Sequence, residues 1–211
     1  TYSQALTAHV EGAHLVSITG GKRAAGLAAD YKVPMDARVD DMVARSDIDA
    51  VIVATPDQHR LEITEKAAAA GKHILVEKPM APTVAECDAM MRVADKAGVQ
   101  LGVVKTERFR TLTRKAKELI DQGELGPIRM MRTLSAFPIS LTQDVFSERQ
   151  WMYDPRSGGL FMGMATHNAD FLRWLSGSNV VRVFAQANTF GDIKAPAQSV
   201  MAQLEFEGGL M

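Results

Sequence analysis

The chain has 211 residues and a nearly balanced charge, because 24 lysines and arginines stand against 25 aspartates and glutamates. Without an excess of positive charge, the composition does not indicate binding to nucleic acid or to an anionic membrane surface. The single cysteine, Cys87, excludes a disulfide or a thiolate metal cluster within one chain and fits a reducing, cytoplasmic setting. No run of about 18 apolar residues occurs, so we expect no membrane span, and the expected partners are small molecules or further copies of the chain.

The first half of the chain alternates short apolar segments with helical ones. Strands are predicted at 14–19, 50–54, 74–76 and 99–104, and helices at 4–10, 22–31, 39–45, 59–70 and 84–97. Thr83 and Glu86 have the spacing of a capping box at the start of the last of these helices. Alternation with short links predicts a parallel, doubly wound sheet with right-handed crossovers.

The pattern changes near Glu107, where we place a domain boundary that gives domains 1–107 and 108–211. Helices are predicted at 112–120 and 160–175 in the second domain. Segments 128–137, 180–188 and 199–206 alternate apolar and polar side chains, as antiparallel strands with one wet face do. The predicted fold class is therefore α/β in the first domain and α+β, with antiparallel strands, in the second.

The stretch from Ile74 to Pro79 places charged residues where function is expected. Ile74 to Val76 form an apolar run, and in open α/β sheets ligands bind beyond the carboxyl ends of the strands, where Glu77 and Lys78 lie. Pro79 restricts Lys78 to extended conformations and permits a cis peptide bond between them. The alternative interpretation is a solvated charged pair at a strand end.

The sequence contains a series of short motifs: Thr55-Pro56, Ala70-Gly71-Lys72-His73 leading into Glu77-Lys78-Pro79, Trp151, Asp154-Pro155, Ser157-Gly158-Gly159, His167 with Asp170, and Trp174-Leu175. Taken in order and at these separations, they resemble the motifs of the Gfo/Idh/MocA oxidoreductases. The resemblance extends over almost the whole chain. It implies a Rossmann domain that binds NAD or NADP, followed by an α+β domain with an open, mainly antiparallel sheet. It also implies hydride transfer between the nicotinamide and a secondary hydroxyl or carbonyl of a sugar, inositol or related polyol.

The sequence departs from the family pattern in three places. The glycine-rich phosphate loop and first strand are expected before Thr1, and more of the C-terminal sheet after Met211, so we expect a chain truncated at both ends. Gly20 replaces the acidic residue that usually ends the second strand, and the cations Lys22 and Arg23 follow it. Because a cation attracts the 2′-phosphate that a carboxylate repels, this change favours NADP over NAD. Gly163 stands where the family often has an aspartate.

The resemblance implies a catalytic role for two residues. His167 is the candidate base, because a neutral imidazole accepts and returns a proton near neutral pH. Asp170, one turn later, could bond the other ring nitrogen or merely share the same helix face. Lys78 would hold the substrate oxygen and stabilise developing alkoxide charge. Without the resemblance, a single helical histidine would be taken as a structural residue.

Other residues are expected to line the cofactor or the substrate. Thr55, Pro56 and His59 follow a Rossmann-type strand, and Glu77 would contact the nicotinamide ribose; a turn and a helix start are the plain alternative. Trp151 and Tyr153 would wall the sugar site, with Asp170 and His167 beside the substrate, although buried aromatic residues are more often core. Lys105, Thr106 and Arg108 could contact cofactor or substrate, or form an exposed basic loop.

Two other functions remain open from the sequence. One is a non-catalytic NAD(P)-binding regulatory protein of the same fold, and the other is a reductase of a non-sugar substrate such as a dihydrodiol. The 5 histidines show no metal-ligand spacing, so we predict no metal. An open apolar sheet face would stay wet in a monomer, so we expect a homodimer or homotetramer.

Overall fold

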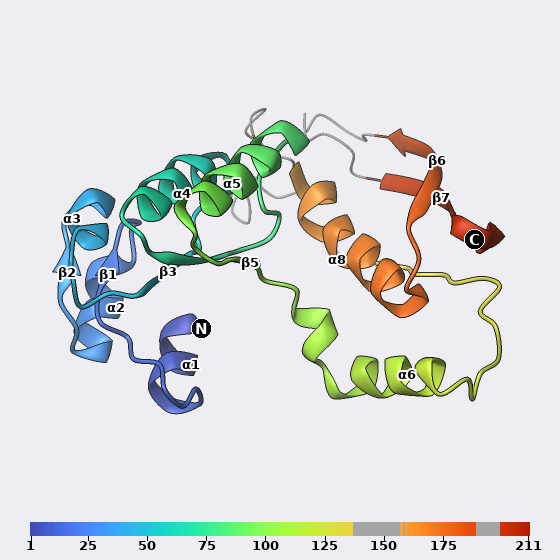
Figure 1. Ribbon diagram of the computed structural model, residues 1–211, viewed down its shortest axis with the longest axis horizontal. Coiled ribbons are helices and arrows are strands. Elements are labelled where there is room, and N and C mark those ends of the chain that lie inside the picture. Colours follow the sequence, from blue (N-terminus) through green and yellow to red (C-terminus); the bar gives the residue numbers. More distant parts are fainter. Residues whose placement is uncertain (137–156, 158, 189–198) are drawn as a thin grey trace. The chain divides into compact units, whose positions relative to one another are not determined.

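The computed structural model describes residues 1–136, 157, 159–188 and 199–211 (Figure 1). The chain divides into two compact units, Thr1–Val103 and Val104–Met211. The domain boundary expected near Glu107 stays a prediction.

The first unit is built on a parallel three-stranded sheet with the order β3-β4-β5. The strands are β3 (Ala50–Val53), β4 (His73–Val76) and β5 (Leu101–Val103). Helix α4 (Arg60–Ala69) links β3 to β4, and α5 (Val84–Ala97) links β4 to β5. These helical crossovers are what parallel neighbours require, and the predicted parallel sheet is confirmed.

The core of this unit lies on one face of the sheet. Ile74 and Val76 of β4 are buried, whereas Leu75, which points to the opposite face, remains 37% exposed. The alternation follows from the two-residue period of a strand. Met90 of α5 and Ala67 of α4 are fully buried against the covered face. The unit therefore buries the apolar run of β4 on one face more completely than on the other.

Helix α5 begins and ends as its sequence predicts. The hydroxyl oxygen of Thr83 accepts a 3.2 Å hydrogen bond from the Glu86 amide, and the Glu86 carboxylate accepts one of 3.1 Å from the Thr83 amide. Gly98 ends the helix at φ +68°, a conformation that glycine adopts without a steric penalty. The predicted capping box is confirmed.

A separate pair of short parallel strands precedes the main sheet. It consists of β1 (Ile18–Thr19) and β2 (Met35–Asp36), joined through α2 (Ala24–Tyr31). The strand predicted at 14–19 is shorter because its partner has only two paired residues, and Pro34 before them has no amide hydrogen to extend the ladder. The remaining elements of the unit are α1 (Tyr2–Ala8), α3 (Val39–Val43) and the 3₁₀ helix η1 (Asp57–His59).

The second unit combines helices with an antiparallel ribbon. Its elements are η2 (Thr106–Phe109), α6 (Thr111–Asp121), α8 (Gly159–Ser176), β6 (Val180–Asn188), β7 (Ser199–Phe206) and η4 (Glu207–Gly209). The pairing of β6 with β7 confirms the two antiparallel strands predicted there. Val183 and Leu204 are directly opposed on one face, and Val183 is 59% exposed. An apolar face of the ribbon thus remains accessible within this unit.

One predicted strand is wrong for the part of the chain that the structure describes. Residues 128–136 form no assigned strand, and residue 137 lies outside the described residues. The Met131 amide donates to the Met211 carbonyl at 2.8 Å, and the Met211 amide donates to the Arg129 carbonyl at 3.4 Å. Alternating apolar and polar side chains are compatible with a strand, but hydrogen bonds to a single residue, Met211, do not form a ladder.

No helix among the described residues is both long enough and apolar enough to cross a bilayer.

Candidate active site

The carboxyl ends of β3 and β4 are tied together by Arg60, the first residue of α4. Its side chain is 4% exposed and donates to the Thr55 carbonyl from Nε at 2.9 Å and from Nη2 at 2.7 Å. Nη1 donates to the Glu77 carbonyl at 2.8 Å and also to the Pro79 carbonyl. A planar guanidinium with five donors can hold several acceptors at once. No pattern in the sequence around Arg60 predicts these contacts.

Glu77 follows β4 and accepts hydrogen bonds through both carboxylate oxygens. Oε1 accepts from the Tyr2 hydroxyl at 2.6 Å, and Oε2 accepts from the Lys78 amide at 2.7 Å. Its own amide donates to the Val53 carbonyl at 2.9 Å, which continues the β3–β4 ladder. Burial, together with the hydrogen bond to Glu77, raises the pKa of Tyr2 above its ordinary range. The Glu77 side chain therefore has a fixed place at the sheet edge.

Lys78 lies between residues whose carbonyls bind Arg60. Its peptide bond to Pro79 is cis, and its side chain is partly buried. Burial lowers the pKa of the ammonium group, Glu77 opposes that change, and the positive charge of Arg60 adds to it. The lysine is thus an ammonium group in a partly desolvated position at the carboxyl edge of the sheet.

The loop after β3 brings further predicted residues to the same edge. Thr55 and Pro56 follow this strand after Ala54, and the hydroxyl oxygen of Thr55 is buried without a hydrogen-bond partner among the described residues. Asp57 is 1% exposed and accepts from the Gln58 amide at 3.1 Å. His59 is exposed at the end of η1. Arg60 therefore links Thr55 to Glu77 and Pro79, the residues on either side of Lys78, whereas the His59 side chain lies at the surface.

The residues predicted to select the cofactor lie in the turn after β1. Gly20 has φ +72° and Gly21 has φ +74°, both in the left-handed region. A β-carbon at Gly20 would have no neighbour within 4 Å, so the turn is open around it. Lys22 and Arg23 are exposed just before α2. Their charges are accessible to an anionic group.

In the second unit, His167 lies on α8 beside a hollow of about 370 Å³. The hollow is lined by Glu107, Thr133, Leu134, Ser135, Met164, His167, Asn168 and Phe171. The Ser135 hydroxyl and the Asn168 amide are 3.2 Å apart in a hydrogen bond. The imidazole of His167 therefore borders a space that combines apolar walls with hydroxyl, amide and carboxyl groups.

Two cations from the segment before α6 bind α8 on either side of His167. Lys105 donates to the Thr166 hydroxyl at 2.7 Å. Arg108 donates to both carboxylate oxygens of Asp170, at 2.8 Å from Nε and 2.6 Å from Nη2, and this bond raises the pKa of Arg108. The sequence left open whether this basic segment contacts a ligand or forms an exposed loop. Lys105 and Arg108 are bonded to α8, so an exposed loop does not describe their side chains. Asp170, expected near the substrate, has Arg108 as a direct partner.

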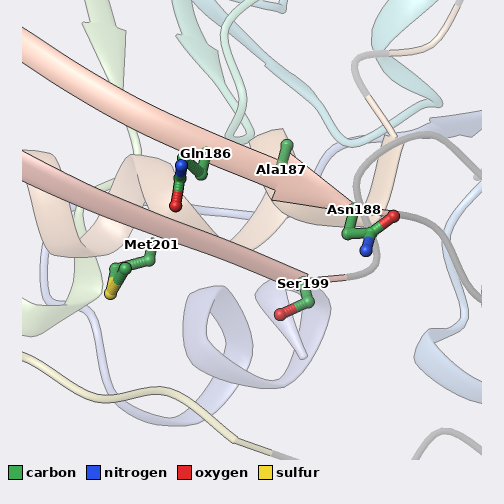
Figure 2. Close-up of a pocket in the computed structure, with 5 residues that line it drawn as sticks. All are labelled: Gln186, Ala187, Asn188, Ser199 and Met201. Atoms are coloured by element: carbon green, nitrogen blue, oxygen red, sulfur yellow. The ribbon is translucent and has the colours of Figure 1, made fainter.

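A larger hollow of about 490 Å³ lies at the end of the β6–β7 ribbon (Figure 2). Gln186 and Met201 are directly opposed across the two strands, and Ala187, Asn188 and Ser199 complete the lining. None of these side chains titrates near neutral pH, so the described lining offers no general acid or base. Lys78 and His167 therefore stay the predicted residues for the chemistry.

Trp151 and Tyr153 lie outside the described residues. Lys78 belongs to the first unit and His167 to the second, and the expectation that one substrate touches both stays a prediction. Among the described residues, no group of three or more histidine, cysteine, aspartate or glutamate side chains could hold a metal ion.

Comparison with known proteins gives matches along both units. The Gfo/Idh/MocA model described as an oxidoreductase family with an NAD-binding Rossmann fold matches residues 1–105, and the model of the C-terminal domain of that family matches residues 113–211. The chain is 29% identical over 81% of its length to a myo-inositol 2-dehydrogenase of Thermotoga maritima, of which it covers 47%. It is also 29% identical over 82% of its length to a 1-carboxy-3-chloro-3,4-dihydroxycyclohexa-1,5-diene dehydrogenase of Comamonas testosteroni, of which it covers 43%.

Solved structures show the same fold. The scyllo-inositol dehydrogenase of Lactobacillus casei, solved with NAD(H) and scyllo-inositol bound, superposes with a TM-score of 0.84 at 26% identity. This match covers 100% of the present chain and 63% of that protein. The chain spans about half the length of the curated relatives reported above.

Proposed function

The chain belongs to the Gfo/Idh/MocA oxidoreductase family, and on this premise we propose that the protein transfers a hydride between NAD or NADP and a secondary hydroxyl or carbonyl of a sugar, inositol or related polyol. The observation that carries the proposal is the position of Lys78. It lies at the carboxyl edge of a parallel sheet in the unit that matches the NAD-binding domain, with Glu77 and Thr55 joined to it through Arg60. This edge is where open α/β sheets bind ligands.

The residues at this edge fit a nicotinamide cofactor. The buried hydroxyl oxygen of Thr55 has no partner among the described residues, so it can bond a ligand without losing an internal bond. Thr55, Pro56, His59, Glu77 and Lys78 are the proposed cofactor contacts on this side. The open turn at Gly20, with Lys22 and Arg23 exposed, supports a preference for NADP, because no carboxylate at this position would repel a 2′-phosphate.

The proposed chemistry divides between the cofactor and two side chains. The nicotinamide, when bound, supplies the site that accepts or returns the hydride. Lys78 donates a hydrogen bond to the substrate oxygen and stabilises the negative charge that grows on it as the hydroxyl proton leaves. His167 takes that proton during oxidation and returns it during reduction. Trp151, Tyr153 and Asp170 remain the proposed residues around the substrate.

A second candidate function is the oxidation of a cyclic dihydrodiol, a non-sugar substrate. The similarity to the Comamonas testosteroni dehydrogenase, whose name describes a dihydroxylated cyclohexadiene, supports it. Both reactions remove a hydride and a proton from a ring CH–OH group, so both use the same two side chains. The two substrates would be distinguished by the side chains that line the substrate site.

The test is turnover by the purified full-length protein. NAD and NADP are each incubated with myo-inositol, scyllo-inositol, aldoses and a cyclic dihydrodiol, and the absorbance of the reduced nicotinamide is followed. Oxidation of a polyol supports the leading proposal, and turnover of the dihydrodiol alone favours the second. Cofactor binding without turnover of any of these would instead indicate a regulatory protein that has kept the fold.

The exposed apolar face of the β6–β7 ribbon supports a homodimer or homotetramer. Val183 lies on this face and is 59% exposed, and the cross-strand pairs Ala185–Ala202 and Ala187–Val200 continue it. An apolar sheet face that stays in water is unfavourable, and a second copy would cover it. Sedimentation velocity of the full-length protein measures the oligomeric state directly.

A further inference from the structure

Arg60 contacts the backbone on both sides of Lys78. Its Nη1 donates to the carbonyl of Glu77, the residue before the lysine, and to the carbonyl of Pro79, the residue after it. The other two donors of the same guanidinium bind the Thr55 carbonyl, in the loop after β3. One rigid group therefore sets the path of the chain through Lys78 relative to the loop that is proposed to hold the cofactor.

Burying the charged side chain of Arg60 is less favourable than burying an apolar side chain of the same volume would be. Removing a guanidinium from water is unfavourable, and apolar residues of similar volume often replace buried ion pairs without loss of stability. Asp57, which is 1% exposed, and Glu77 attract the buried charge and offset part of that cost. What an apolar side chain could not supply is the set of donors to three carbonyl oxygens.

Few backbone amides in this turn are available to hydrogen-bond the carbonyls that Arg60 binds. The amide of Glu77 is used in the ladder with Val53, the amide of Lys78 bonds the Glu77 side chain, and Pro79 has no amide hydrogen. The turn is therefore anchored largely by a side chain from α4. Movement of that side chain would move the lysine.

From these contacts we propose that Arg60 is a positioning residue, which holds the Lys78 ammonium group in the orientation that the reaction needs and keeps it aligned with the cofactor loop at Thr55. This inference rests on the proposed function for its catalytic consequence. Arg60 itself touches neither substrate nor cofactor in the proposal, and it acts through Lys78.

The charge of Arg60 provides a second link to the same lysine. It lowers the pKa of Lys78 in addition to the larger effect of burial, while Glu77 opposes both. Removing the charge should therefore raise the pKa of Lys78, whereas moving it slightly should not. The titration of Lys78 therefore reports whether the charge of Arg60 lies close to the ammonium group.

The experiment compares Arg60→Lys, which keeps the charge but loses the planar fork, with Arg60→Gln, which loses both. Arg92→Gln is the matched control, because Arg92 is an exposed arginine on the neighbouring helix α5. In the full-length protein, kcat should fall about 10-fold in Arg60→Lys and about 10²-fold in Arg60→Gln, since small misplacements of a reacting group cost rate. The dissociation constant of the cofactor should change far less, and Arg92→Gln should leave kcat unchanged.

Two further measurements separate positioning from a general structural role. In a Lys78→Ala background, Arg60→Lys should lower kcat by less than about 2-fold, because residues that act through one group are not additive. NMR titration of ¹³C-labelled lysine should show the Lys78 pKa raised in Arg60→Gln and nearly unchanged in Arg60→Lys. This titration needs no turnover, so it tests Arg60 even if the proposed function fails.

Three results would overturn the proposal. The first is an equal fall of kcat for Arg60→Lys with and without Lys78. The second is an unchanged Lys78 titration in Arg60→Gln. The third is loss of the fold in both variants, which would show that Arg60 serves the fold and not the lysine.

Discussion

The hydroxyl group of Tyr2 donates a 2.6 Å hydrogen bond to the carboxylate of Glu77, which lies 75 positions later in the chain. The bond connects α1 to the residue that follows β4, directly before Lys78. A phenolate at this position would be partly buried and would face a carboxylate, so the protonated form is favoured and the pKa is raised.

We therefore expect Tyr2 to lose its proton only above the pH range in which tyrosine ordinarily ionises. In an absorbance titration of tyrosinate, the Tyr2→Phe variant should lack the phase that occurs at the highest pH. Tyr31→Phe serves as the control and should keep that phase. Loss of a phase at lower pH in Tyr2→Phe would show that the hydroxyl is not held by Glu77.

The ion pair between Arg108 and Asp170 should stabilise the second unit. The Asp170 side chain is 12% exposed and that of Arg108 is 41% exposed, so solvent screens the pair in part. A double-mutant cycle of Arg108→Gln and Asp170→Asn, measured by urea unfolding, should give a coupling free energy of about 1 kcal/mol. The same cycle at the exposed pair Lys115 and Glu118 should give no measurable coupling. Equal results at the two sites would contradict a stabilising role.

The turn at Gly20 should control the choice between NADP and NAD. Gly20→Asp should weaken NADP binding relative to NAD binding by about 10-fold, because a carboxylate repels the 2′-phosphate. Gly20→Asn is the matched control, because asparagine has the same size and meets the same strain at φ +72° without the charge. Titration of both cofactors against both variants measures the ratio. An unchanged ratio in Gly20→Asp would mean that the neighbouring cations point elsewhere.

Lys78 and His167 should each be needed far more for turnover than for cofactor binding. Lys78→Ala and His167→Ala should each lower kcat by about 10²-fold or more, since electrostatic and general-base groups act mainly in the transition state. The double variant should lose less than the product of the two effects, because both residues serve one proton transfer. Lys96→Ala, an exposed change on α5, is the control. Wild-type kcat in either single variant would remove that residue from the mechanism.

The pH dependence of kcat should report the ammonium group of Lys78. Burial lowers its pKa, so the group loses its proton, and with it the charge that stabilises an alkoxide, at a lower pH than an ordinary lysine. The alkaline limb of the kcat profile should therefore lie below the ordinary lysine range. Lys78→Arg, which stays charged at all accessible pH values, should lack this limb.

Local patterns in the sequence were sufficient for much of the fold. Alternating helices and short apolar runs predict a parallel sheet, because parallel neighbours need crossovers of that length, and β3, β4 and β5 are parallel. The capping box at Thr83 involves residues three apart, so its geometry follows from the helix itself. The same locality explains why Glu77 and Lys78 could be placed at the end of a strand from the sequence alone.

Tertiary structure decided what depends on distant partners. Alternation in 128–136 shows that a strand would have an apolar face, but it does not say whether a neighbour offers a ladder. Arg108 and Asp170 are 62 positions apart, and nothing near either residue indicates the other. Arg60 is the clearest case, because its partners are backbone carbonyls, which every residue possesses and no side-chain pattern records. Only the folded chain brings three such carbonyls, from the ends of β3 and β4, within reach of one buried guanidinium.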